Sequence, residues 1–430
     1  MDMRAADFSA EQFRLDRQLR IDGWRQEALT NAKIGVVGDD DLAASLFLLS
    51  AAALGIGRVV VLAPTLQRPY DEIAQKLNPH FRLVHLQGYY THRLVDEVFN
   101  GCNLIVDLSH YAIANKLLLE KGFRDRMPIV RGFCCEHADE QGFKVFTYRR
   151  GREWQELTQV VSPRNFPGSH FADGVFALIV AGIALEETKN LLMGGQVSDE
   201  LIAYGRKTLD FVPGETHLLV VGAGALGVFV GMALAFVGCR KITFMDADTV
   251  EVTNLNRQVL FFDAVGESKA AALVRRLNEL FTIDCRAQPH DFTSATDLSP
   301  YDVIFDCVDN FESRIVLSEK CRDAGKVLIS GGVGVDAGQV VVFSPHHGGT
   351  TPAELLGIYD IVAGRAGDTL PRGAASCTRR PDPSVIMTNQ IIAGFMVESY
   401  RMLANGHNPE NIFYDSRNNR KILQERSRVS

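Results

Sequence analysis

The sequence lacks the extensive basic patches, long apolar runs and secretory signal that mark nucleic-acid-binding, membrane and secreted proteins. The 430-residue chain has a formal charge of -7 and is locally basic only from Arg417 to Arg428, so nothing predicts a nucleic-acid partner. No apolar run reaches the roughly 20 residues of a membrane-spanning helix, and the N-terminal residues lack the apolar core of a secretory signal. These absences predict a cytoplasmic protein that binds neither nucleic acid nor membrane.

Cysteine is also sparse and shows no metal-binding pattern. Eight cysteines are scattered along the chain, which is typical of reduced thiols rather than of a disulfide scaffold. No two of them form the Cys-x-x-Cys pair by which many structural sites hold zinc. We therefore expect no structural zinc.

What the chain does contain is one pattern twice. Residues 216–246 have the order of an apolar strand, a glycine turn, an apolar-periodic helix and a second strand, and residues 32–64 repeat that order at nearly the same spacing. Three further pairs of blocks recur in the same order: NLIVDLSH with DVIFDCVDN, residues 131–151 with 330–349, and AGIALEE with AGFMVES. The sequence thus predicts an α/β fold of two tandem, doubly wound, Rossmann-like halves that form a pseudo-dimer within one chain.

The limits of the two halves follow from these blocks. The halves run from Arg14 to Gly195 and from Phe211 to Gly406, with a link of about 15 residues between them. As domains, this gives residues 1–200, 201–408 and a tail, 409–430, with room for at most one short strand. Residues 344–376 are rich in Gly, Pro and Thr and are interpreted as a long crossing loop, a kind of loop that is usually functional.

Only the second half has the residues of a nucleotide site. Gly222, Gly224 and Gly227 lie between a strand and a helix, where glycines permit a tight turn and the helix N-terminus favours phosphate. Asp246 ends the next strand, where an acid can bind ribose hydroxyls. On these four residues alone, a nicotinamide- or flavin-binding domain explains the pattern equally well.

The residues after Asp246 favour a triphosphate instead. Asn254, Arg257, Gln258 and Lys269 follow within a short span and can converge on a polyanion, which a redox dinucleotide would not need. Asp309 follows another apolar strand and is a natural Mg²⁺ ligand, since a carboxylate near a triphosphate needs a cation between them. The simpler alternative is that these side chains are helix caps and solvated loop residues.

The first half lacks each of these parts. Three aspartates follow Gly38 in place of the glycine loop, Ala63 stands in place of Asp246, and His110 in place of Asp309. We therefore expect the first half to bind no nucleotide. It does have Arg17 ahead of its first strand, and this side chain can reach the phosphates of the other half if the two halves pack about a pseudo-two-fold axis.

The combination of GAGALG, Asp246, TNLNRQ, GESKA and DCVDN resembles the family of ubiquitin-activating-type (ThiF/MoeB-like) adenylating enzymes over nearly the whole chain. The resemblance implies ATP and Mg²⁺ as cofactors and adenylation of the C-terminal carboxylate of a ubiquitin-like protein. It further implies that Arg17 crosses to the active half, that Asp246 binds ribose, and that Asp309 binds magnesium. It assigns the phosphates to the four remaining side chains: Asn254, Arg257, Gln258 and Lys269.

Cys377 resembles the catalytic cysteine of modifier-activating enzymes because it starts a Cys-Thr stretch ahead of an apolar helix. Arg379 and Arg380 should favour its thiolate. A thioester on Cys377 would then pass to a conjugating enzyme. The alternative is a sulfur-carrier or peptide adenylyltransferase whose acyl-AMP meets a separate nucleophile, and a scaffold with two inactive halves is a further alternative. The sequence leaves open whether two chains associate as a homodimer.

Overall fold

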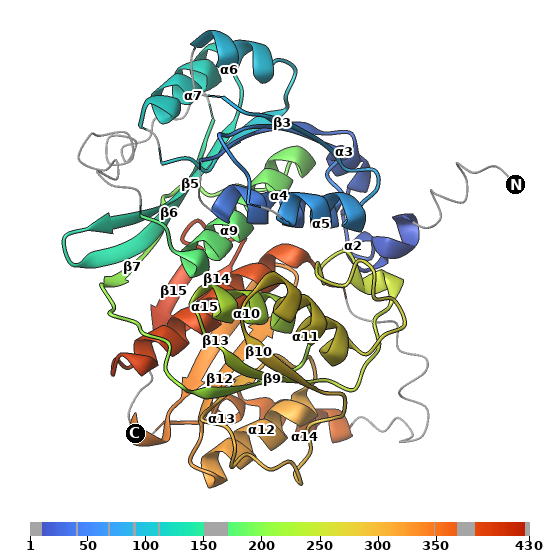
Figure 1. Ribbon diagram of the computed structural model, residues 1–430, viewed down its shortest axis with the longest axis vertical. Helices are drawn as coiled ribbons and strands as arrows, with labels where there is room; N and C mark the ends of the chain where they lie inside the picture. The colour runs from blue at the N-terminus through green and yellow to red at the C-terminus, as the bar shows by residue number, and fades with distance from the viewer. Residues whose placement is uncertain are drawn as a thin grey trace, which may run out of the picture.

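The computed structural model describes residues 11–39, 42–67, 69–88, 92–110, 112–149, 171–347, 349–367 and 383–425 (Figure 1). Two sheets with helices on their faces make up the protein, in the strand orders β3-β2-β1-β4-β5-β6-β7 and β10-β9-β8-β11-β12-β13-β14-β15. In each sheet the first five strands of that order are parallel and the rest antiparallel. The predicted fold class, two doubly wound α/β halves, is confirmed. Among the described residues, no helix combines the length and apolar character that a membrane crossing needs.

The first half alternates strands and helices as the repeat predicts. Its elements are α2 (Asp16–Leu19), α3 (Gln26–Thr30), β1 (Lys33–Val37), α4 (Leu42–Leu54), β2 (Arg58–Leu62), α5 (Tyr70–Leu77), β3 (Arg82–Leu86), α6 (His92–Val98), β4 (Leu104–Asp107), α7 (Ala112–Asp125), β5 (Ile129–His137), β6 (Glu140–Tyr148), α9 (Gly174–Met193) and β7 (Ile202–Lys207).

The second half repeats this order. Its elements are β8 (His217–Val221), α10 (Ala225–Phe236), β9 (Lys241–Met245), η1 (Val252–Asn254), α11 (Lys269–Leu280), β10 (Asp284–Gln288), β11 (Val303–Asp306), α12 (Phe311–Asp323), β12 (Val327–Val333), β13 (Ala337–Phe343), η2 (Pro345–His347), α13 (Pro352–Leu355), α14 (Ile358–Gly367), α15 (Ile386–Ala404), β14 (Asn411–Asp415) and β15 (Ile422–Glu425).

The two halves pack through helices that are buried over most of their length. Helices α4, α9, α10 and α15 lie between the sheets (Figure 1), and α9 packs directly on α15. A Cβ on Gly182 of α9 would lie 2.8 Å from Ile391, and one on Gly394 of α15 would overlap Ile179. The two glycines occupy the same place in the repeated AG sequences, so the close crossing of the helices follows a pseudo-two-fold relation. The segment from Val175 to Leu185 is a buried helix because this interface covers every side of it.

Three details of the expected organisation differ from the structure. The link between the halves contains β7, which extends the first sheet because Ile202 and Tyr204 alternate inward. The tail contains two strands, β14 and β15, rather than at most one, and both extend the second sheet. They pair because Ile412, Tyr414 and Ile422 are buried there. The crossing loop contains α13 and α14 up to residue 367, so it is partly helical.

Candidate adenylation site

The glycine loop after β8 needs glycine for steric reasons. Gly222 has φ +99°, and a Cβ on it would lie 2.6 Å from the carbonyl oxygen of Cys307. A Cβ on Gly227 would overlap the carbonyl of Gly222. Gly224 is the N-cap of α10 and has no side chain that could occupy the helix N-terminus. The loop therefore lies close against the end of β11 and leaves the positive end of α10 open to an anion.

Asp246 is fixed directly beside this loop. Its carboxylate accepts hydrogen bonds from the backbone N–H groups of Ala223, at 2.7 Å, and Asp248, at 2.8 Å. Burial raises the pKa of Asp246, while nearby Lys269 and the two backbone donors act in the opposite direction. The acid is thus held at the end of β9 with its orientation set by the glycine loop itself.

Lys269 begins α11 on the same side of the sheet. Its ammonium lies 2.7 Å from the carboxylate of Asp248, which is largely exposed, whereas the lysine side chain is mostly buried. Its backbone N–H also donates to the carbonyl of Asp248, at 2.9 Å. Because the carboxylate of Asp248 is largely exposed, this ion pair is open to solvent on the side of Asp248.

The segment between β9 and α11 buries the other polar candidates. Asn254 accepts the N–H of Glu251 with its side-chain oxygen, at 2.9 Å, and so caps the short helix η1. Arg257 donates from Nη1 to the carbonyl of Thr253 and to the side chain of Asn256, both at 2.8 Å. Gln258 is 3 % exposed, and its side-chain oxygen is buried with no hydrogen-bond partner among the described residues.

Arg17 reaches this segment from the first half. Burial and the charge of Arg17 lower the pKa of Arg257 to about 10, while Asp309 and Glu251 act in the opposite direction. Burial, followed by the charge of Arg20, lowers the pKa of Arg17, which also feels Glu251 and Asp309. Two arginines from different halves therefore lie within electrostatic range of Asp309, which is exposed just beyond the end of β11.

The second half of the chain matches a known protein family. A family model described as "ThiF family" matches residues 213–428, which is half of the chain. The chain belongs to the ThiF family. The match begins just before the glycine loop and includes every second-half residue described above.

Individual relatives of the ThiF-family chain match shorter parts of it. The mouse protein "Adenylyltransferase and sulfurtransferase MOCS3" is 39% identical over 166 residues, covering 35% of this chain and 35% of the relative. "Sulfur carrier protein adenylyltransferase" of Thermus thermophilus is 39% identical over 135 residues, covering 30% of this chain and 49% of the relative. These matches span half or less of the length of either relative.

Among solved structures, that of E. coli MccB with AMPCPP and MccA matches part of the chain. It has a TM-score of 0.41 and 21% sequence identity, and the match covers 50% of this chain and 65% of that one.

The sequence prediction missed several residues of this ThiF-family site. Asp248 pairs with Lys269, Glu251 adds a negative charge near both arginines, and Asn256 contacts Arg257. All three lie in the polar segment after Asp246, and this position was the one sequence signal that could have identified them. Cys377 lies outside the described residues.

In the first half, a buried pair occupies the place that corresponds to the site. The carboxylate of Asp39 accepts the backbone N–H of His110 at 2.5 Å and lies 2.9 Å from its ring Nδ1, and both side chains are nearly fully buried. Asp39 follows Gly38 as Ala223 follows Gly222, and Ala63 is in the place of Asp246. Asp39 and His110 correspond to Ala223 and Asp309 of the second half. In the first half, these two positions are hydrogen-bonded to each other.

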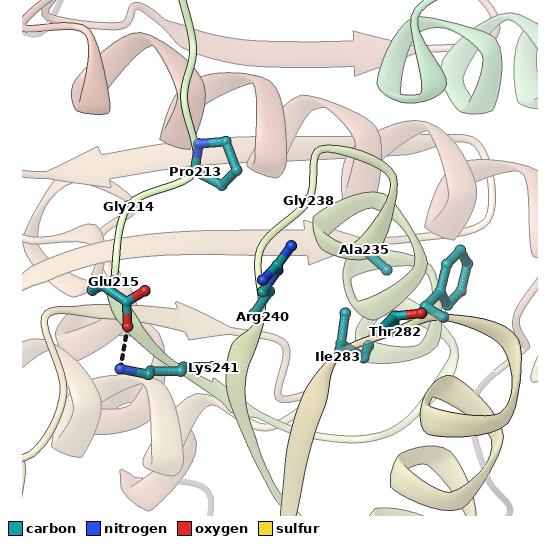
Figure 2. A pocket seen from close by; sticks show the side chains of 10 residues that line it. Pro213, Gly214, Glu215, Ala235, Gly238, Arg240, Lys241, Thr282 and Ile283 are labelled. Carbon is teal, nitrogen blue, oxygen red and sulfur yellow. Dashed lines mark ion pairs between the residues drawn. The ribbon is translucent and has the colours of Figure 1, made fainter.

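A cavity of about 340 Å³ lies elsewhere, at the amino ends of β8 and β9. Figure 2 shows its lining, which includes Pro213, Arg240 and the ion pair between Lys241 and Glu215. The glycine loop lies at the opposite, carboxyl ends of the same strands, where open α/β sheets bind ligands. We therefore assign no part of the nucleotide site to this cavity.

Proposed function

We propose that the second half adenylates the C-terminal carboxylate of a ubiquitin-like or sulfur-carrier protein with ATP. The observation that carries this proposal is the convergence of four features at one sheet edge: a steric glycine loop, the fixed carboxylate of Asp246, a cationic group of Arg257, Lys269 and Arg17, and the exposed carboxylate of Asp309. A dinucleotide-binding oxidoreductase would need only the first two. Family membership and the names of both relatives support the same chemistry.

The proposed reaction joins the acyl group to AMP. A carboxylate oxygen of the substrate attacks the α-phosphorus of ATP, the bond to the bridging oxygen breaks, and pyrophosphate leaves with the bonding electrons. The N–H groups of the glycine loop and the cations of Arg257 and Lys269 would stabilise the charge that accumulates on the phosphates. Asp246 would accept hydrogen bonds from the ribose hydroxyls.

Magnesium fits this arrangement as a partner of the nucleotide. Among the described residues, no cluster of three or more His, Cys, Asp or Glu side chains is placed to hold a metal. Mg²⁺ does not need one, because it usually binds through one or two carboxylates together with phosphates and water. Asp309 is the exposed carboxylate at the right edge, and the ion would neutralise part of the triphosphate charge there.

The first half would then be a non-binding partner that supplies Arg17. Its Asp39 carboxylate at the position corresponding to the phosphate loop would repel a nucleotide, and the contact with His110 occupies the carboxyl end of the sheet. We expect one ATP per chain.

The finer proposal concerns the acyl-AMP. The thiolate of Cys377 would attack its carbonyl carbon, AMP would leave, and the thioester would pass to a conjugating enzyme. Burial raises the pKa of six other cysteines, namely Cys102, Cys135, Cys239, Cys285, Cys307 and Cys321, which makes them poor nucleophiles. The competing proposal is attack by a separate sulfur donor, which the names of the two relatives favour.

Three measurements test these proposals in turn. Calorimetry with ATP and Mg²⁺ should give one site per chain, and pyrophosphate exchange should require a ubiquitin-like protein that ends in glycine; tight NAD binding without ATP binding would refute adenylation. Asp309→Asn should abolish the exchange. In the same mixture, a thioester sensitive to thiol reductants should form on the wild-type protein but not on Cys377→Ala. Exchange without any enzyme-bound acyl group would establish the competing route.

A further inference from the structure

The residue after Arg17 makes a direct hydrogen bond between the two halves. Gln18 has no exposed surface. Its Nε2 donates to the carbonyl of Leu54 at 2.9 Å and to the side chain of Gln26 at 2.7 Å. Its Oε1 accepts a hydrogen bond from Nδ2 of Asn256 in the second half, at 3.1 Å. The side chain is therefore anchored in one half and contacts the other.

Asn256 continues this connection to the nucleotide site. It is also fully buried, and its Oδ1 accepts from Nη1 of Arg257 at 2.8 Å. The same Nη1 donates to the carbonyl of Thr253, so two fixed acceptors orient the guanidinium. One of these two acceptors is held in place from the first half, through Gln18.

The two ends of this chain determine the direction of every hydrogen bond in it. A backbone carbonyl such as that of Leu54 can only accept, and a guanidinium such as that of Arg257 can only donate. Between them, each amide must turn its NH₂ toward Leu54 and its oxygen toward Arg257. Reversing either amide would bring two donors or two acceptors together in a buried site, which is costly. A side-chain amide has both a donor and an acceptor, so the amides of Gln18 and Asn256 together satisfy the carbonyl of Leu54 and the guanidinium of Arg257.

We propose that Gln18 is a positioning residue that orients Arg257 through Asn256. The first half thus contributes to the site twice, by placing Arg17 directly and by fixing the arginine that the second half supplies. Because Gln18 and Arg17 are neighbours in α2, the hydrogen bond from Gln18 to the carbonyl of Leu54 helps to position both side chains. As far as it concerns nucleotide binding, this inference rests on the proposed function.

The first test measures ATP·Mg²⁺ affinity by calorimetry. Gln18→Met is close in size but removes the acceptor of Asn256, and we expect affinity to fall about tenfold, the effect of losing support for one hydrogen bond to a charged group. Because Gln18 acts through Asn256, the double variant Gln18→Met/Asn256→Ala should bind no more weakly than Asn256→Ala alone. Independent, multiplying losses in the double variant would overturn the proposal.

Gln390→Met is the matched control. Gln390 is likewise a fully buried glutamine that joins the halves, donating to the carbonyl of Leu178 at 2.9 Å and accepting from Ser50 at 2.7 Å, but it lies within the interface of α9 and α15. The variant Gln390→Met should lower thermal stability as Gln18→Met does, but it should leave ATP affinity unchanged. An equal loss of affinity in both variants would show that Gln18 acts only through general stability.

A second readout does not depend on ATP. The guanidinium resonances of Arg257, assigned by their loss in Arg257→Lys, should shift or broaden in Gln18→Met and remain unchanged in Gln390→Met. If the wild-type protein binds no ATP, the proposed function fails while this measurement still decides the positioning role. Unchanged Arg257 resonances in Gln18→Met would overturn it. If that variant does not fold, Gln18→Asn serves the same purpose, because its shorter amide cannot contact both Leu54 and Asn256.

Discussion

The two halves share one topology but differ in the loop after their first strand. In the second half, Gly222 has a positive φ and Gly227 packs against its carbonyl. In the first half, the φ of Gly38 lies outside the left-handed region, and Ala43 occupies the position of Gly227. A Cβ at that position cannot coexist with the tight loop of the second half. The fold therefore tolerates the loss of the glycine pair, whereas the tight conformation of the loop does not.

The comparison also separates structural acids from functional ones. Asp306 and Asp107 both end a central strand, both are buried, and each is paired with an arginine, Arg314 and Arg131 respectively. An acid present in both halves is explained by this internal pairing. Asp309 lies three residues further on, is exposed, and has His110 as its counterpart. The acid found in one half only is the one that the proposed chemistry needs.

After the loss of exchange expected for Asp309→Asn, the largest effect should come from removing the contribution of the first half to the second. Arg17→Ala should lower the rate of pyrophosphate exchange about 10³-fold, as the loss of an arginine finger does in phosphoryl transfer. The control is Arg20→Ala in the same segment, where the ion pair of Arg20 with Asp16, at 2.6 Å, is partly exposed and contributes little. Equal losses in both variants would mean that Arg17 acts only through general electrostatics.

A smaller effect should follow from exchanging the residues that distinguish the two loops. Gly227→Ala should lower the exchange rate about 10²-fold, because its Cβ must displace the carbonyl of Gly222 and shift the loop by about 1 Å. The reciprocal variant Ala43→Gly should leave exchange unchanged and cost about 0.5–1 kcal/mol of unfolding free energy. Full activity in Gly227→Ala would show that the tight loop is not required.

Much of this organisation could be predicted from sequence because it depends on local patterns. The repeat of strand, glycine turn and helix gave the two halves, and polar residues directly after apolar strands gave Asp246 and Asp309. The strands β7 and β14 were harder to predict. Each is short and pairs with residues distant in the chain, so its only local signal is a brief alternation such as Ile412 and Tyr414.

Cross-half contacts were the least predictable part of the site. A glutamine such as Gln18 or an asparagine such as Asn256 has no local signature, because its hydrogen-bond partner lies 238 residues away in sequence. Lys421 is a further case, since its buried ammonium pairs with Glu187 of α9 at 3.1 Å, although the tail around it is polar in sequence. Such pairings depend on how the two halves pack, and the sequence of either half alone does not indicate them.

The smallest effect on activity should come from opening the corresponding place in the first half. Asp39→Ala removes the acceptor of the backbone N–H of His110 and the partner of its ring, so unfolding free energy should fall by about 1–3 kcal/mol. ATP affinity and the stoichiometry of one ATP per chain should not change, because Ala63 and Ala43 still leave the first half without a ribose acid and a tight loop. Calorimetry measures the affinity and stoichiometry of ATP binding, and chemical denaturation of the same sample measures the unfolding free energy. A second ATP bound to Asp39→Ala would show that a single carboxylate, rather than the whole loop, separates the halves.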